Sequence, residues 1–192
     1  MSTKRQATRD AILDATWQRL ERGRDARLED VAADAGVTRQ AVYLHFGSRA
    51  GLLLALVDHM DSRLGLYARI EENRAIGDPV ARLDAVLSLM ADYEPKIHRV
   101  AMVLFHAAQT DADVRAAFDD RMSRRRADLA RVIKELRARG RLVKTWTSAE
   151  IIDLLWQAGA PPSYDLLVVQ RGWKPARYKA WLLALARSFV RR

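Results

Sequence analysis

Residues 28–49 constrain the fold of this chain more than any other segment, because they predict two short helices joined by a tight turn. Gly36 ends the first helix, since glycine accepts the left-handed backbone that such a turn requires. The apolar side chains of that helix have the spacing of one buried face and are Leu28, Val31, Ala32 and Ala35. Two helices joined this closely must pack against each other, so the segment predicts a compact helical unit.

The second helix, predicted over 39–46, buries Val42 and Phe46 and turns polar side chains outward. Thr38 precedes it and is placed to accept a hydrogen bond from the first free N–H groups of the helix. The outward residues are Arg39, Gln40, Tyr43 and His45. Each of them alone would be an ordinary solvated side chain. Together on one face of a short, supported helix, they favour a helix-turn-helix motif that binds DNA.

This stretch resembles the N-terminal domain of the TetR family of bacterial transcriptional regulators. The resemblance lies in the turn 35–38, in Tyr43-x-His45-Phe46 and in Ser48-Arg49 with Leu52 and Leu53, and the preceding helix matches through Arg9, Ile12, Leu13, Ala15, Leu20 and Gly23. Two positions depart from the family pattern: Gln40 stands where a small residue is common, and Arg49 stands where lysine is usual. The first departure changes what the helix can contact, so the operator cannot be transferred from a relative.

Spacing and resemblance together imply a role for each residue of the exposed face. Arg39 and Gln40 lie at the helix end that enters the major groove, where arginine suits guanine and glutamine suits adenine. Tyr43 and His45 occupy positions that contact backbone phosphates in the family. The expected partner is therefore double-stranded operator DNA.

Further phosphate contacts are expected at both ends of this motif. Thr38 caps the helix and can donate its hydroxyl to a phosphate. Arg49 follows Ser48 at the start of a helix, which is a natural phosphate site. Lys4 and Arg5 are expected to form a mobile basic arm that reaches the DNA backbone or the minor groove.

Composition agrees with a globular protein, since 49% of the 192 residues are hydrophobic and 30% are charged. The absence of cysteine excludes disulfides and thiolate metal sites. The first ten residues lack the apolar stretch of a signal peptide, and no apolar run approaches the roughly 20 residues of a membrane span. These features predict a cytoplasmic protein without a membrane partner.

The net charge of +9 supports DNA binding less than it first suggests. Residues 1–50 contain nine basic and seven acidic residues, a net charge of only +2. Residues 121–144 contain ten basic and two acidic residues, so most of the excess lies outside the motif. That run is better interpreted as a solvated helix face than as a second nucleic-acid site, because local placement decides phosphate binding.

The whole chain predicts an all-α fold of about nine helices, with a DNA-binding domain over 1–47 and a larger helical ligand-binding and dimerisation domain over 48–192. One long helix is expected from Ser48 towards Arg74, and Pro95 is expected to begin another. Thr147 and Glu150 form a capping-box pattern before an apolar helix. Gly172 and Pro175 separate that region from the last helix.

Apolar faces of the last two helical regions predict a homodimer. The helix from Ile151 is apolar nearly all round, and the final helix has a wide aromatic stripe, so a partner subunit would cover both. This C-terminal region also resembles the part of the family that forms the dimer. The expected interface residues are Ile151, Leu155, Tyr178, Trp181, Leu182, Leu185 and Phe189.

By resemblance, the larger domain should hold a pocket for a small-molecule effector whose binding releases the repressor from DNA. Apolar and aromatic residues with a few polar groups are typical of such pockets. The candidates are Met90, Tyr93, Met102, Phe105, His106, Gln109 and Trp156, although a core role is the alternative for each of them.

Other functions find less support in the residues. His98 and His106 are eight residues apart and Glu94 precedes His98 by four, but no further ligand is evident, so no metal or cofactor is expected. The chain has no zinc-protease motif, no phosphate-binding glycine loop and no nucleophile elbow, so no catalytic residues are assigned. An adaptor whose reading helix has lost DNA binding, or an enzyme of unrecognised chemistry, are the alternatives.

Overall fold

The computed structural model describes residues 2–191, so Met1 and Arg192, the ends of the two predicted domains, lie outside the described residues. Within that range the chain forms ten α-helices and one π-helical segment and has no strand beyond a single isolated bridge. The all-α prediction is confirmed. The helices are α1 (Ser2–Glu21), α2 (Leu28–Asp34), α3 (Arg39–Phe46), α4 (Arg49–Arg63), α5 (Leu66–Arg74), α6 (Pro79–Ala107), α7 (Ala112–Ala138), α8 (Ser148–Ala158), α9 (Pro161–Tyr164), the π-helical η1 (Asp165–Gln170) and α10 (Pro175–Ser188).

Two helix boundaries differ from the prediction. The helix expected from Ser48 towards Arg74 is broken into α4 and α5 at Gly65, whose φ of 65° is left-handed and ends α4. Pro95 does not begin a helix but lies inside α6. Ala91 and Ile97 on either side of it are buried, so packing of a continuous helix outweighs the one backbone hydrogen bond that proline removes.

Local signals elsewhere are confirmed. Thr147 and Glu150 form a reciprocal capping box at the start of α8, with Thr147 N donating to Glu150 Oε2 at 2.7 Å. The Asp78 carboxylate accepts a hydrogen bond from Ala81 N at 2.9 Å at the start of α6. The Glu150 side chain also accepts from the Thr147 hydroxyl, and these hydrogen bonds lower the pKa of its carboxyl.

The described chain divides into two compact units. Unit 1 contains the residues up to Leu66 together with Arg99–Phe118, and unit 2 contains Tyr67–His98 and the residues from Asp119 onward. The long helices α6 and α7 each pass from one unit to the other. The functional division predicted at residue 47 therefore lies within unit 1 and remains a prediction.

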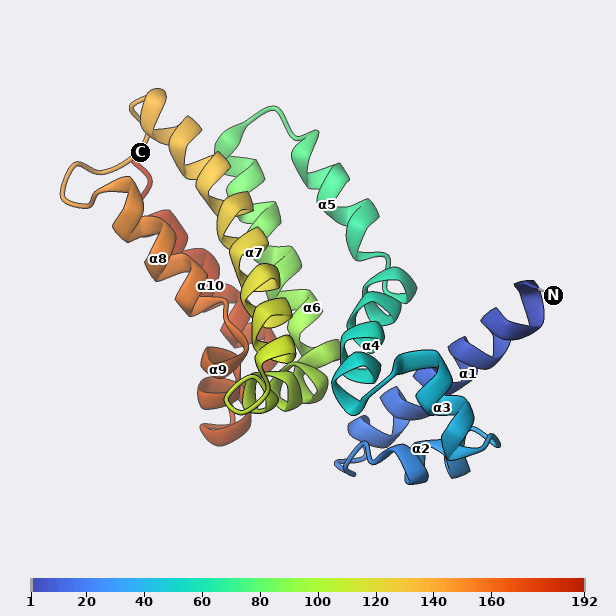
Figure 1. Cartoon of the computed structure of the whole chain (residues 1–192). Coiled ribbons are helices and arrows are strands. Elements are labelled where there is room, and N and C mark those ends of the chain that lie inside the picture. Colours follow the sequence, from blue (N-terminus) through green and yellow to red (C-terminus); the bar gives the residue numbers. More distant parts are fainter. Residues whose placement is uncertain (1, 192) are drawn as a thin grey trace. The chain divides into compact units, whose positions relative to one another are not determined.

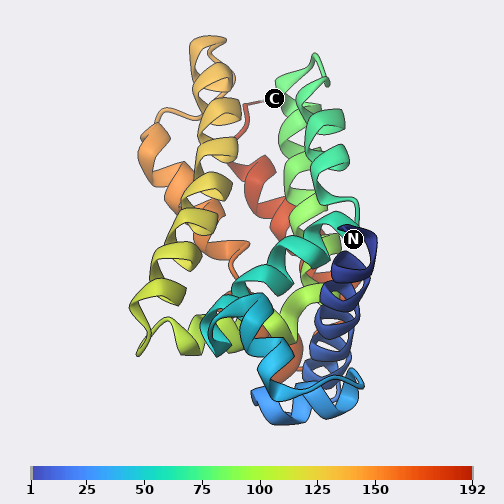
Figure 2. The same cartoon turned by 45° about the vertical axis from the view of Figure 1, so that its right-hand side comes forward.

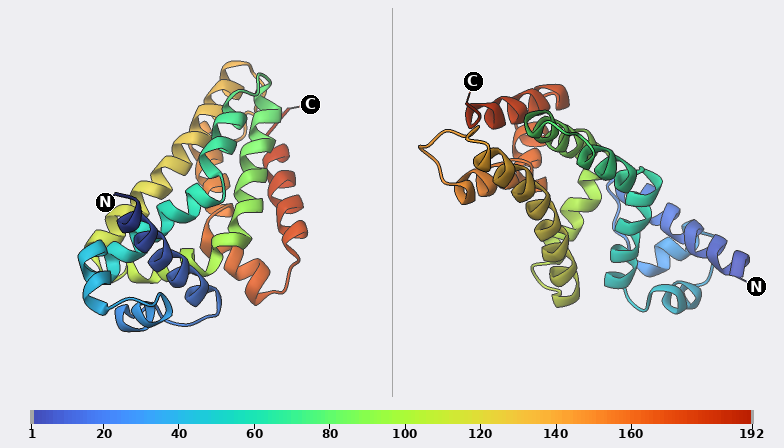
Figure 3. Two further views of the ribbon diagram at one scale, coloured as in Figure 1. Left: turned by 90° about the vertical axis from the view of Figure 1, so that its right-hand side faces the viewer. Right: turned by 90° about the horizontal axis from the view of Figure 1, so that it is seen from above.

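In unit 1, α1 packs against α2 and α4, and α2 lies beside α3 (Figures 1 and 3). Fully buried aliphatic side chains hold these helices together. They come from α1 (Ile12, Leu13), α2 (Val31), α3 (Val42) and α4 (Leu52, Leu53, Leu56). One Leu→Ala change at such a site costs about 3 kcal/mol of unfolding free energy, so this core fixes the orientation of α3 firmly.

In unit 2, α6 and α7 run side by side, with α8 and α10 next to them (Figures 1 and 2). A continuous apolar core joins Leu87 of α6, Ile133 of α7, Leu155 of α8 and Leu182 of α10. The end of the chain also belongs to this unit, because Val143 N donates to Phe189 O at 2.9 Å in the segment after α7. The C-terminal helix is therefore part of the core of its own chain.

This packing corrects the residues that were expected at a dimer interface. Five of the seven fill the core of unit 2, because α6 and α7 cover them within the same chain. These five are Ile151, Leu155, Tyr178, Leu182 and Phe189. Trp181 and Leu185 remain partly exposed, and the neighbouring Leu154, Leu166 and Val169 are exposed. Exposed apolar side chains are thus left on α8, η1 and α10, and most of them differ from those expected.

No helix in the described part of the chain has the length and apolar character needed to cross a membrane.

Candidate nucleic-acid interface

The α2–turn–α3 segment has helix-turn-helix geometry. Gly36 takes a φ of 65° in the turn, and Val37 N donates to Ala32 O at 2.9 Å, which closes α2. The hydroxyl of Thr38 accepts a hydrogen bond from Ala41 N at 3.1 Å and caps α3 as predicted. Val42 is completely buried against the other helices of unit 1. The buried side of α3 is therefore anchored, and its opposite side faces solvent.

Three of the predicted DNA-contacting residues are exposed on α3. The side chain of Arg39 is 73% exposed and that of Tyr43 is 60% exposed, and Gln40 is exposed as well. None of the three belongs to the buried core. A polar and aromatic surface on an anchored short helix can donate hydrogen bonds to base edges and phosphates.

The remaining predicted residues of the motif are placed differently from expectation. His45 is half-buried instead of fully outward, because its ring lies against that of Phe46 with 5.9 Å between centroids. Phe46, expected to be buried, is half-buried, and the Arg9 guanidinium lies over its ring at 5.5 Å. Lys4 and Arg5 are exposed, but they belong to the first turns of α1 instead of a mobile arm.

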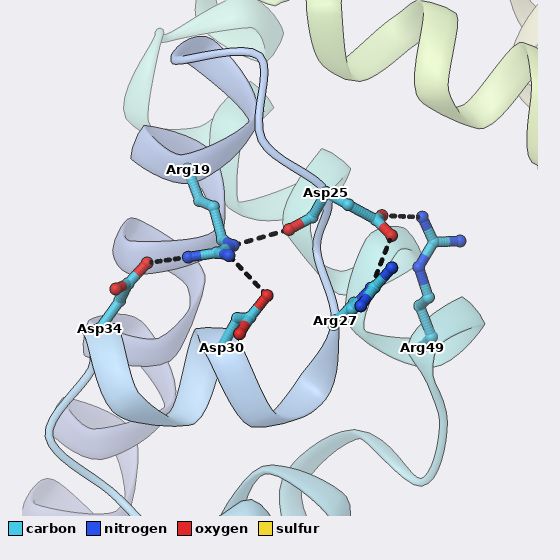
Figure 4. A network of polar contacts seen from close by, with 6 residues as sticks. All are labelled: Arg19, Asp25, Arg27, Asp30, Asp34 and Arg49. Atoms are coloured by element: carbon cyan, nitrogen blue, oxygen red, sulfur yellow. Dashed lines mark hydrogen bonds and ion pairs between the residues drawn. The ribbon is translucent and has the colours of Figure 1, made fainter.

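A network of ion pairs fixes α2 to α1 (Figure 4). Arg19 of α1 has a side chain that is only 13% exposed. Its guanidinium donates to Asp30 Oδ2 at 2.5 Å, to Asp34 Oδ2 at 2.8 Å and to the backbone oxygen of Asp25 at 2.6 Å. The planar guanidinium thus holds both turns of α2 and the loop before it, a geometry that lysine could not reproduce. Because α2 packs against α3, this network also positions the exposed face of α3.

Two of the candidate DNA-contacting arginines have acidic partners. Arg49 donates to Asp25 Oδ1 at 2.8 Å (Figure 4), and Arg39 Nε lies 3.8 Å from Glu29 Oε2. Partial burial raises the pKa of Asp25, but the hydrogen bond and the charge of Arg49 lower it by a larger amount. The pKa of this carboxyl therefore lies below its usual value. Both arginines are solvent-exposed and can exchange these carboxylates for phosphates.

Sequence reasoning missed Leu44, which is 71% exposed on α3. Helical periodicity could have predicted this exposure, because Leu44 follows the buried Val42 by two residues and therefore lies about 200° around the helix from it. The acidic partners Asp25 and Glu29 were missed for another reason. Their pairing with Arg49 and Arg39 depends on the folded arrangement of separate segments, which helical periodicity does not describe.

The residues expected to line an effector pocket do not belong to one unit. Met90, Tyr93 and Trp156 lie in unit 2, where Tyr93 is buried and Trp156 Nε1 donates to Met122 O at 2.9 Å. The others lie in unit 1, and two of them are exposed. These others are Met102, Phe105, His106 and Gln109, of which His106 and Gln109 are exposed. The pocket remains a prediction for all seven.

A buried ionic cluster occupies unit 2. Glu94 of α6 is only 1% exposed, and its carboxylate lies 3.5 Å from His98 Nδ1 and 3.9 Å from Arg125 Nη1. His98 Nε2 lies 3.0 Å from Asp165 Oδ1 in η1, and its ring packs against Tyr164. Both ring nitrogens therefore face carboxylates, which favours the imidazolium. His98 and Glu94, considered above as metal ligands, are held by these groups, and His106 lies in the other unit.

The stability of unit 2 should depend on the protonation of His98. Burial lowers the pKa of His98, but the hydrogen bonds and charges of Glu94 and Asp165 raise it more, so the folded pKa lies above the usual 6.5. The stabilisation is therefore fully present below pH 6.5 and is lost as the pH rises through the folded pKa. Chemical unfolding measured from pH 6 to pH 9 should show this decline in the native protein.

The matched comparison uses two histidine substitutions. His98→Gln should remove the decline, whereas His106→Gln, at an exposed histidine, should preserve it. A decline of the same size in the wild-type and His98→Gln proteins would show that the cluster does not cause it.

Taken together, the anchored short helix, its Thr38 cap and its exposed polar face define a helix-turn-helix protein. Residues 12–56 match the family described as bacterial regulatory proteins, tetR family. Two relatives agree with this match. TtgR, a transcriptional regulator of Pseudomonas putida, is 30% identical over 57% of this chain and 54% of its own length. LfrR, a transcriptional repressor of Mycolicibacterium smegmatis, is 32% identical over 62% of this chain and 61% of its own length. The chain thus spans about half the length of the curated relatives it matches.

The fold is shared over the full chain with a solved structure. A transcriptional regulator from Saccharomonospora viridis in complex with choline has a TM-score of 0.82 and 19% identity, and the similarity covers 100% of both chains. Residues 12–56 thus match the TetR family, and the whole chain shares the fold of the regulator from Saccharomonospora viridis. The family and the relatives named above are transcriptional regulators and not enzymes.

Proposed function

We propose that this protein is a DNA-binding transcriptional regulator that acts as a homodimeric repressor in the bacterial cytoplasm. The observation that carries the proposal is the exposed face of α3, where Arg39, Gln40 and Tyr43 project from a helix that is anchored by Val42. Residues 1–47 form the proposed DNA-binding domain, which includes Thr38 and His45, and Arg49 follows it at the start of α4. Repression is favoured by the name of LfrR.

Dimerisation would present two reading helices to one operator. The partly exposed Trp181 and Leu185, with the exposed Leu154, Leu166 and Val169, give the surface that a second copy would cover. Because a two-fold dimer presents the same residues twice, the operator should be roughly palindromic, with half-sites set by the distance between the two α3 helices.

Release by a small-molecule effector is the regulatory part of the proposal. The domain proposed over 48–192 would bind the effector, as the choline complex of the structurally similar regulator suggests. An effector shifts the protein away from DNA only if it binds the released arrangement more tightly than the DNA-bound one.

The proposal is tested by measuring binding of the purified protein to DNA fragments from both sides of its own gene at low salt. We expect a specific complex that contains two protein chains per operator, by mobility shift and by sedimentation. Failure to bind any fragment, with an intact fold, would instead support the adaptor alternative. Turnover of a substrate would support the enzyme alternative.

Removal of the acidic partner of Arg39 should strengthen DNA binding. Glu29→Gln abolishes the 3.8 Å ion pair and removes a negative charge beside the proposed interface, so the affinity should rise about threefold. Glu72→Gln, at another exposed glutamate outside the motif, is the matched control and should leave the affinity unchanged. Fluorescence anisotropy at fixed salt compares the two variants, and weaker binding by Glu29→Gln would contradict the proposed position of Arg39 at the DNA.

A further inference from the structure

Leu44 is an apolar side chain in the middle of the proposed reading surface. Among the large hydrophobic residues of the described chain it has the highest exposed fraction, 71%. Its neighbours on α3, Gln40 and Tyr43, are exposed too and do not cover the Leu44 side chain. Such a residue gains nothing from folding, because its surface stays in water in the free protein.

The position of Leu44 on α3 relates it directly to the base-reading residues. It follows Gln40 by four residues and therefore lies on the same face, one turn further along the helix. Four residues advance about 6 Å along a helix, whereas one base pair advances about 3.4 Å along DNA. Leu44 should therefore meet a base pair one or two steps away from the pair that Gln40 contacts.

The major groove offers one apolar group at a base edge, the C5-methyl group of thymine. Phosphates and the other base-edge groups are polar and would gain nothing from a leucine side chain. We propose that Leu44 determines sequence specificity by packing on a thymine methyl group of the operator. The inference rests on the proposed DNA-binding function and adds a particular base to it.

The basic and polar neighbours of Leu44 favour DNA over another protein as the group that covers it. Arg39 and Tyr43 share the exposed surface of α3, and Arg49 lies at the start of the next helix. A surface that combines guanidinium, amide and phenol groups with one isolated leucine provides donors for phosphates and bases around a single apolar contact. An apolar protein partner would require a larger continuous hydrophobic patch.

The experiment removes single methyl groups from the DNA. Once a binding fragment is known, each thymine of one half-site is replaced in turn by deoxyuridine, which keeps the hydrogen-bonding groups and lacks only the methyl. The wild-type protein should bind about fourfold more weakly at one or two of these positions. Leu44→Ala should bind the unmodified site about fourfold more weakly and should be insensitive to uracil at the same positions.

An exposed side chain outside both the motif and the proposed dimer surface provides the control. Tyr67→Ala should keep the uracil sensitivity of the wild type. The denaturation midpoint of Leu44→Ala should equal that of the wild type, because the side chain is exposed, and this excludes misfolding as the cause of weaker binding.

The two proposals fail in different ways. Equal sensitivity to uracil in the wild-type and Leu44→Ala proteins, or no sensitivity in either, would overturn the role of Leu44 while leaving DNA binding intact. Absence of binding to any fragment would overturn the proposed function itself, and the role of Leu44 with it.

Discussion

Replacement of Arg39 and Tyr43 together by alanine is expected to weaken operator binding about a hundredfold. One base-edge contact and one phosphate contact are lost, and a good base contact alone accounts for about 1–3 kcal/mol, or roughly five- to 150-fold. Both side chains are exposed, so the unfolding transition should stay where it is in the wild type. Affinity is measured by anisotropy on the specific fragment, and stability by chemical denaturation.

A matched pair of substitutions separates this effect from loss of charge and of an aromatic ring. Arg124→Ala with Tyr67→Ala removes the same side-chain types from exposed positions outside the motif. This control should bind DNA within about twofold of the wild type. An equal loss of affinity in both double variants would show that the net charge of the chain, and not the surface of α3, governs binding.

Arg125→Met should destabilise the protein by about 3 kcal/mol, the largest stability effect expected from a single polar residue in unit 2. Arg125 Nη1 lies 3.9 Å from the buried Glu94 carboxylate, and Arg125 Nη2 donates to Gly159 O at 2.5 Å. Without the guanidinium, Glu94 stays buried, with His98 beside it at 3.5 Å. Urea denaturation at pH 7 measures the loss.

Two further variants test the physical cause. Arg124→Met changes the adjacent, exposed arginine and should cost less than about 0.5 kcal/mol. Glu94→Met with Arg125→Met removes both charges and should be more stable than Arg125→Met alone, because an apolar pair carries no desolvation penalty. A double variant less stable than the single one would show that the buried carboxylate is not the source of the effect.

Local signals in the sequence predicted much of the structure. The Thr38 and Thr147 caps and the turn at Gly36 depend only on residues within a few positions of each other, and each is found as expected. Helical periodicity also predicted the buried Val42 and the outward Arg39. These features follow from backbone hydrogen bonding and side-chain direction, which neighbouring residues determine.

Features that depend on distant segments were not predictable in this way. The apolar stripe of α10 was interpreted as a dimer surface, yet Tyr178 is buried inside the chain and donates its hydroxyl proton to Ala158 O at 2.7 Å. Periodicity shows which face of a helix must be covered but not what covers it. The Arg19 network and the pairing of Arg49 with Asp25 are likewise set by the tertiary fold.

The pairing of arginines with carboxylates in unit 1 has a consequence for how a regulator would find its site on a chromosome. Bulk DNA attracts a protein through phosphates alone, and a domain that carries Asp25 and Glu29 beside its arginines attracts it weakly. At the correct sequence, base contacts add to the binding free energy and outweigh that repulsion. A repulsion that acts equally at every site would leave the ratio of the two affinities unchanged but would free the protein from the many competing sites, while base contacts would keep the operator occupied.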